Sequence, residues 1–129
     1  MKFEVVFSFL PEYVRLTVEG ALQLEEFQKM WNGVLQSGEW KVGTAVLLDC
    51  RRRSLTSIEQ NNLAAELADF YLSRDTDLRA CRMASLIGGP ENFGFSRRME
   101  YALSIRHSSI VLRTFYGEAA AIDWLTART

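Results

Sequence analysis

The sequence predicts an α/β fold in which a mostly parallel, mixed sheet of five strands is combined with four helices. Strand-like apolar runs alternate with segments of helical periodicity, in the order β-β-α-β-α-β-α-β-α. The run Val46 to Cys50 is apolar on both faces, which is typical of a central strand in a parallel sheet. The first two strands are separated only by a short turn at Pro11, which predicts an antiparallel hairpin.

The first hairpin is expected to lead directly into an amphipathic helix. Residues 2–9 are rich in β-branched and aromatic residues and predict a strand that ends before Pro11. Residues 13–20 alternate between apolar and polar positions, which predicts a strand with one buried face. Gly20 breaks the alternation, and an apolar stripe of helical period follows over residues 24–35. The core face of the second strand is expected to carry Val14, Leu16 and Val18.

The rest of the chain continues the alternation of strands and helices. We expect strands over 46–50, 83–87 and 110–115, helices over 57–73 and from about 92 to 107, and a last helix after Gly117. Thr56 and Glu59 have the spacing of a capping box for the second helix, with Ser57 as another candidate cap. The sequence shows no repeat, low-complexity stretch or linker, so residues 1–129 are expected to form one domain.

Composition argues against several classes of protein. The formal charge of −1 and the pI near 5.9 do not favour nucleic-acid binding, which usually needs a basic surplus. Two isolated cysteines, Cys50 and Cys81, fit neither a disulfide framework nor a zinc site, and buried free thiols are expected. No signal peptide is recognised, because Glu4 interrupts the apolar start and no small-residue cleavage site follows. No transmembrane segment is recognised, because no apolar run approaches the roughly 20 residues that a spanning helix needs. A cytoplasmic protein is therefore expected.

No constellation of catalytic residues can be identified. The sole histidine, His107, follows Arg106 at the predicted end of a helix, where capping or solvent exposure explains it. Asp49 ends the central strand, and a structural role is expected for it, in pairing an arginine or holding backbone amides of the next segment. There is no glycine-rich phosphate loop, nucleophile elbow or pair of metal ligands. We therefore expect neither an enzyme nor a metal or cofactor site.

The arginines form a candidate anion site. Arg51, Arg52 and Arg53 are expected in a loop beyond the carboxyl end of the third strand, and Arg97 and Arg98 in the first turns of the third helix. The carboxyl ends of parallel strands meet at one edge of a sheet, so the five guanidinium groups could converge on one anion. In the alternative, they pair with acidic residues such as Glu91 and Glu100 or are solvated.

Several segments resemble a known family. The stretches YVRLTVEGAL, VLLDCR, RMASLIG, FGFSRRMEYA and FYGEAAAIDWL are similar to STAS domains, the fold of bacterial anti-sigma-factor antagonists. The chain looks most like the divergent, SpoIIAA-like branch that shares a superfamily with the Sec14-type lipid-transfer fold. The resemblance implies a STAS-like fold over nearly the whole chain and a non-catalytic, regulatory role.

The chain departs from that family at the phosphorylation motif. Antagonist STAS domains carry Asp-Ser-Ser/Thr-Gly just before the second helix, where a kinase phosphorylates one hydroxyl. Here the equivalent stretch is SLTSIEQNN, which offers Ser54, Thr56 and Ser57 without that pattern. The hydroxyls could accept a phosphate held by the nearby arginines, or simply cap the helix.

Two classes of function remain after this comparison. The first is a binding or regulatory module that acts on a protein partner or on a second copy of itself, as a homodimer. The aromatic residues of the first hairpin, Phe7, Phe9 and Tyr13, are candidates for an exposed surface that such a partner covers. The alternative is a small-ligand module that binds an acidic amphiphile, a lipid or acyl compound, at the arginine-lined edge.

Overall fold

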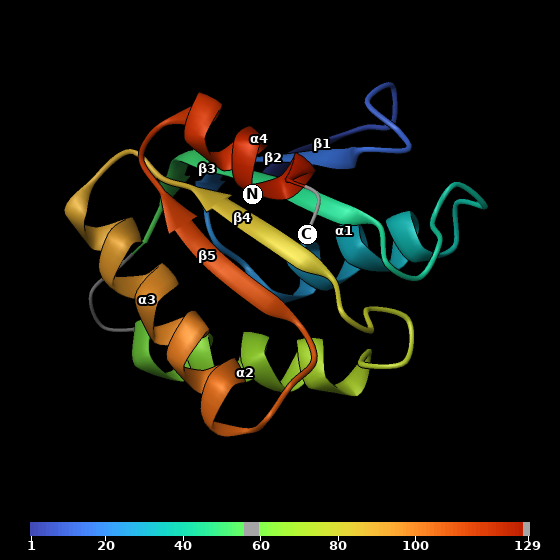
Figure 1. The fold of residues 1–129 in the computed structure, drawn as a ribbon. Coiled ribbons are helices and arrows are strands. Elements are labelled where there is room, and N and C mark those ends of the chain that lie inside the picture. The colour runs from blue at the N-terminus through green and yellow to red at the C-terminus, as the bar shows by residue number, and fades with distance from the viewer. Residues whose placement is uncertain (56–59, 128–129) are drawn as a thin grey trace.

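The computed structural model describes residues 1–55 and 60–127, and its elements follow the predicted order (Figure 1). The chain runs through β1 (Lys2–Val6), β2 (Tyr13–Ala21), α1 (Leu24–Leu35), β3 (Ala45–Ser54), α2 (Gln60–Ser73), β4 (Arg82–Leu86), α3 (Pro90–Ile105), β5 (Val111–Phe115) and α4 (Glu118–Thr126). The predicted α/β class, with five strands and four helices, is therefore confirmed.

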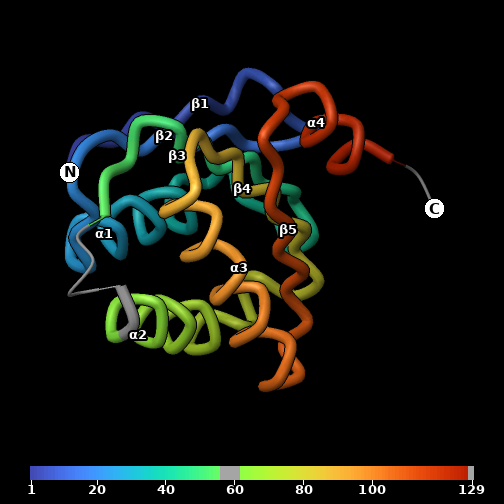
Figure 2. The backbone as a smooth tube through the Cα atoms, turned by 90° about the vertical axis from the view of Figure 1, so that its left-hand side faces the viewer, coloured from blue at the N-terminus to red at the C-terminus, as the bar shows by residue number. Residues whose placement is uncertain are grey.

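The sheet is mixed in the way the sequence predicts. Its strands lie side by side in the order β1-β2-β3-β4-β5. The hairpin β1–β2 is antiparallel, with Phe3 opposite Val18, and the remaining neighbours are parallel. The three helices that connect parallel strands, α1 to α3, lie on one face of the sheet, and α4 lies on the other (Figure 2).

The two faces of the sheet bury cores of different size. The larger core lies under α1, α2 and α3 and contains Trp31, Phe27 and Phe95. As predicted, β2 directs Val14, Leu16 and Val18 into it, and all three are fully buried. The smaller core lies under α4. β3 contributes to both cores, with buried Leu48 in one and buried Leu47 in the other, which confirms it as a central strand.

The first hairpin differs from the prediction. β1 ends at Val6, and residues 8–12 form turns. Tyr13 is 4% exposed because it belongs to the core under α4 and stacks on Phe9 with ring centroids 4.9 Å apart. Phe7 is half-buried against the larger core, while Phe9 is 41% exposed. The prediction of an exposed aromatic surface is therefore wrong for Tyr13, and only Phe9 of the three is largely exposed.

The start of α3 differs from the prediction, whereas the predicted start of α2 stays a prediction. The described part of α2 begins at Gln60, and the capping box of Thr56 and Glu59 lies outside the described residues. α3 begins at Pro90, two residues earlier than expected, because proline suits the first helical position, where no backbone donor is needed. Gly88, just before α3, allows the backbone of Arg51 to approach closely, because a Cβ atom at position 88 would lie 3.1 Å from the carbonyl oxygen of Arg51.

The described residues include both cysteines and all the helices that were searched for a membrane-spanning segment. Cys50 and Cys81 are free and buried, as predicted. Over residues 1–55 and 60–127, no helix combines the length and the apolar character needed to cross a membrane.

Candidate functional site

Arg51, Arg52 and Arg53 lie within β3 and not in a loop, which corrects the prediction. β3 continues to Ser54, four residues beyond its expected end. Thr17 of β2 lies opposite Asp49, but Glu19 lies opposite Arg52, so β3 holds one residue more than β2 in this interval. Such a bulge changes which side each following side chain takes.

The bulge separates the three arginines. Arg51 and Arg52 bond to residues on the α4 side of β2 and β3, Asp49 and Glu19. Arg53 returns to the side of α3 and is 5% exposed. Arg97 and Arg98 lie on the exposed face of α3, and Arg97 is 3.9 Å from the Glu100 carboxylate. The five residues thus occupy several environments, and anion binding by them as a group stays a prediction.

Asp49 is the centre of a network of four charged side chains. Its Oδ1 accepts hydrogen bonds from the backbone N–H of Arg51 (3.1 Å) and from Arg51 Nε (3.0 Å). Its Oδ2 accepts from Arg51 Nη2 (2.8 Å) and Arg15 Nη2 (2.9 Å). Arg15 also donates to Glu118, in the first turn of α4. The expected structural role of Asp49, pairing an arginine and holding a backbone amide, is confirmed.

The electrostatics of this network favour the charged forms of Asp49 and Arg15. Burial alone would raise the pKa of Asp49, but the hydrogen bonds and positive charges of Arg51, together with Arg15, outweigh it, and the pKa lies below its ordinary value. Burial opposes the charge of Arg15 as well, yet Glu118 and Asp49 raise its pKa. Two cations and two anions therefore balance, and the network ties β2 and β3 to the start of α4.

Of the three candidate phosphorylation residues, only Ser54 lies in the described part of the chain. It is exposed at the end of β3, and its carbonyl oxygen accepts a hydrogen bond from Leu22 N–H at 3.1 Å. Thr56 and Ser57 lie outside the described residues. Phosphorylation at these positions stays a prediction.

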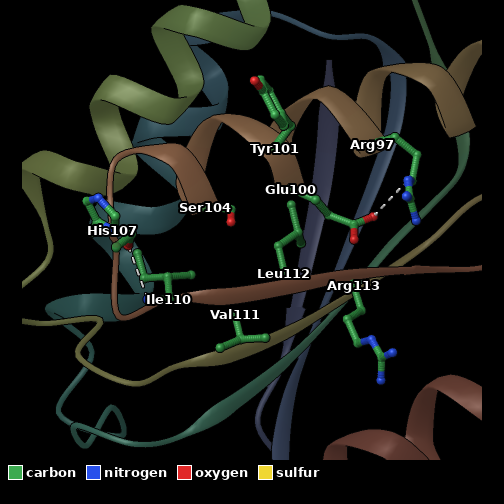
Figure 3. Close-up of a pocket in the computed structure, with 10 residues that line it drawn as sticks. Arg97, Glu100, Tyr101, Ser104, His107, Ile110, Val111, Leu112 and Arg113 are labelled. Carbon is green, nitrogen blue, oxygen red and sulfur yellow. Dashed lines mark hydrogen bonds and ion pairs between the residues drawn. The ribbon is translucent and has the colours of Figure 1, made fainter.

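A recess that the sequence did not predict runs along β5, beside the second half of α3 (Figure 3). It has a volume of about 720 Å³ and opens to solvent. Leu112 points from β5 toward α3, whereas Val111 and Arg113 lie on the other side of the strand. The lining of the recess includes Arg97, Glu100, Tyr101, Ser104, His107, Val111 and Arg113.

β5 is the last strand of the sheet, and its outer edge forms part of this recess. Val111 N–H donates to Cys81 C=O at 2.9 Å, and Ile87 N–H donates to Phe115 C=O at 2.9 Å. The backbone groups of Val111 and Phe115, which are alternate residues of β5, therefore point toward β4. Those of Leu112 and Thr114 consequently point outward, where no strand of the described residues pairs with them. Periodicity identifies a strand but cannot show whether its second edge is covered.

The recess carries positive charge on both sides of β5. Arg97 comes from α3, and Arg113 from the opposite side of the strand. The recess also contains one carboxylate, Glu100, which accepts a hydrogen bond from Thr114 Oγ1 at 2.6 Å and lies 3.9 Å from Arg97, so two arginines face one glutamate. Val111 is 49% exposed and adds an apolar contact. This edge suits an extended chain with acidic side chains.

Comparison with known proteins gives a match in structure. No protein-family model matches the sequence, and neither does any curated protein. The structure is similar to the crystal structure of an uncharacterised protein of the DUF3478 family, with a SpoIIAA-like fold, from Shewanella loihica PV-4. The TM-score is 0.60 at 17% identity, and the match covers 96% of this chain and 92% of the other.

The chain has a SpoIIAA-like fold. The STAS-like fold implied by the sequence resemblance is thus confirmed, including the mixed sheet and the four helices. At this level of identity the similarity concerns the fold alone.

Proposed function

We propose that this STAS-like chain is a non-catalytic regulatory module that binds an extended, acidic segment of a protein partner along β5. A SpoIIAA-like fold suggests a regulatory module. The observation that carries the proposal is the outer edge of β5, which lies in a solvent-open recess between two arginines.

Strand addition explains how such a segment would be held. An extended peptide beside β5 would exchange main-chain hydrogen bonds with Leu112 and Thr114, whose groups point outward. Successive side chains of a strand alternate between faces, so acidic residues on either face would meet Arg97 or Arg113. Main-chain bonds would supply affinity, and the arginines would select for negative charge.

A second copy of this chain fits the same edge less well. If two β5 strands paired antiparallel about their centre, Arg113 of one copy would lie opposite Arg113 of the other. Like charges directly opposite each other in a ladder are unfavourable. The homodimer expected from the sequence therefore stays a prediction, which sedimentation of the purified chain tests, and the acidic partner is favoured at β5.

Selection from a displayed library of random dodecapeptides tests the proposal without a known partner. We expect enriched peptides to combine acidic with β-branched residues and to shift the backbone amide signals of Leu112 and Thr114 in NMR spectra. The double variant Arg97→Glu/Arg113→Glu should weaken binding about tenfold or more, because attraction becomes repulsion. The matched control Lys29→Glu/Lys41→Glu makes the same change of charge at two exposed lysines elsewhere and should bind as the unaltered chain does.

Two results would overturn the proposal. One is a selection in which no peptide binds, or in which the enriched peptides are not acidic. The other is an equal loss of affinity in the two double variants, since that would mean that net charge alone, and not the β5 edge, controls binding.

A further inference from the structure

Arg53 is an arginine fixed inside the larger core. It is 5% exposed, and its Nε donates a 2.7 Å hydrogen bond to Oδ1 of Asn92, in the first turn of α3. Asn92 Nδ2 donates in return to the carbonyl oxygen of Arg53 at 2.9 Å. The guanidinium carbon lies 4.9 Å from the centre of the Phe95 ring. These contacts hold the side chain in one position.

The charge of Arg53 is not balanced within the described part of the chain. Arg15, Arg51 and Arg52 each lie within 4.0 Å of a carboxylate, whereas Arg53 has no such neighbour among residues 1–55 and 60–127. Its Nη2 is buried and has no hydrogen-bond partner. A guanidinium cannot shed its proton, and within the described residues no carboxylate balances this charge in a largely apolar interior, which is unfavourable.

A small cavity adjoins this group. It measures about 20 Å³ and is lined by residues of α1, α2, α3, β3, β4 and β5, among them Arg53, Ser85 and Tyr71. The hydroxyl of Ser96, also in the lining, is already bonded to Thr114 Oγ1 at 2.6 Å. Burial raises the pKa of Tyr71, so its hydroxyl stays protonated and able to donate. The other lining residues among those described are apolar: Phe27, Leu48, Leu67, Phe95, Met99 and Leu112.

We propose that this cavity is a binding site for one monatomic anion of the size of chloride or bromide, held by Nη2 of Arg53. The volume suits a single particle of about the size of a water molecule. A phosphate group, or an acidic head group with an acyl chain, exceeds it. The apolar wall favours a halide that gives up its water readily, so fluoride should bind more weakly than chloride. Iodide should bind weakly because of its size.

The site lies where it would support the fold. An anion beside Nη2 balances the charge of Arg53, and Arg53 joins the end of β3 to the start of α3 through Asn92. The cavity shares only Leu112 with the lining of the β5 recess, which contains neither Arg53 nor Asn92. The halide site and the peptide site can therefore be tested independently.

Thermal unfolding of the full chain is the first test. Protein dialysed into sodium gluconate is titrated with chloride, bromide, fluoride or iodide at constant ionic strength. An anion at ten times its dissociation constant raises the ratio of folded to unfolded chain about 11-fold, which corresponds to a rise of roughly 5 °C in melting temperature. We expect a saturable rise with chloride and bromide, retained in the control Arg52→Met and lost in Arg53→Met.

Crystals of the unaltered chain grown in bromide give a second readout that needs no variant to fold. The expected result is an anomalous peak at hydrogen-bond distance from Nη2 of Arg53. A water molecule at that position without anomalous signal would overturn the proposal. So would a chloride response that is equal in the unaltered chain, Arg52→Met and Arg53→Met, because ordinary screening of surface charge would then explain it.

Discussion

Replacing Asp49 by asparagine should remove the centre of the charge network while keeping the shape of the side chain. The carboxylate accepts four hydrogen bonds, two on each oxygen, from Arg51 and Arg15. An asparagine keeps one acceptor oxygen and turns a donor toward the other pair of donors. Glu118, whose side chain is 40% exposed, is then the remaining anion of the network beside two arginines.

The expected loss of stability follows from the hydrogen bonds that Asp49→Asn removes. Two charge-assisted hydrogen bonds contribute about 1.5 kcal/mol each at the lower limit, and partial exposure of Arg51 reduces one of them. We therefore expect Asp49→Asn to lower the free energy of unfolding at pH 7 by about 2–3 kcal/mol. For a chain of this length that corresponds to roughly 7–11 °C in melting temperature.

The effect should depend on pH in a defined direction. The pKa of Asp49 in the folded chain lies below its ordinary value of 3.8, so its contribution to stability is fully present above that value. It is lost as the pH falls through the lower, folded-state pKa. The difference between the unaltered chain and Asp49→Asn should consequently be constant from about pH 5 to pH 8 and shrink below about pH 4.

Urea unfolding monitored by tryptophan fluorescence at several pH values measures this difference. Glu19→Gln is the matched control, because Glu19 also pairs with an arginine of β3 but both side chains are well exposed, at 41% and 80%. The control should change stability by less than about 0.5 kcal/mol. A loss in Asp49→Asn no larger than that of the control, or one that persists unchanged at pH 3, would refute the reasoning.

Three further predictions concern the core, a helix and the thiols. Leu48→Ala should cost about 2–5 kcal/mol in urea unfolding because Leu48 is 4% exposed, whereas Val111→Ala at the half-exposed edge should cost far less. Gly94→Ala, within α3, should stabilise the chain by about 0.5–1 kcal/mol, since an added Cβ there meets nothing within 4 Å; a lower melting temperature would contradict this. Burial raises the pKa of the thiols of Cys50 and Cys81, the latter to about 12. Both should therefore react with a thiol reagent only at the rate of unfolding. Fast labelling of the native chain would contradict this, because it would show that the thiols are accessible.

The elements of the fold could be predicted because burial leaves a period in the sequence. The alternation of Val14, Leu16 and Val18 identifies β2 and its buried face, and the structure confirms both. The doubly apolar run around Leu47 and Leu48 likewise identifies β3 as central, because each of its faces contacts a core. The same patterns predict the order of the elements, the resemblance to STAS domains implies the fold, and the structural comparison confirms that fold.

The arrangement of the arginines could not be predicted from the same kind of pattern. Three successive charged residues are typical of a loop, so β3 was expected to end before Arg51. In the structure, each side chain has its own partners: Asp49 for Arg51, Glu19 for Arg52, and Asn92 with the Phe95 ring for Arg53, whose Nη2 has no partner among the described residues. Asp49 belongs to β3 itself, but Glu19, Asn92 and Phe95 come from other elements, and no local feature of the triplet encodes those three.

The backbone on either side of the bulge explains why Arg53, and not Arg52, enters the core. Asp49 Oδ1 holds the N–H of Arg51 at 3.1 Å, and the carbonyl of Ser54 accepts from Leu22 N–H at 3.1 Å. These two bonds fix the ends of a short segment that contains one residue more than the facing part of β2. The neighbouring arginines are chemically identical, so composition cannot decide which of them is buried. The register of β3 against β2 decides which arginine is buried. The hydrogen bond between Asp49 and the backbone of Arg51 is therefore as important to the position of Arg53 as the bonds that Arg53 itself makes.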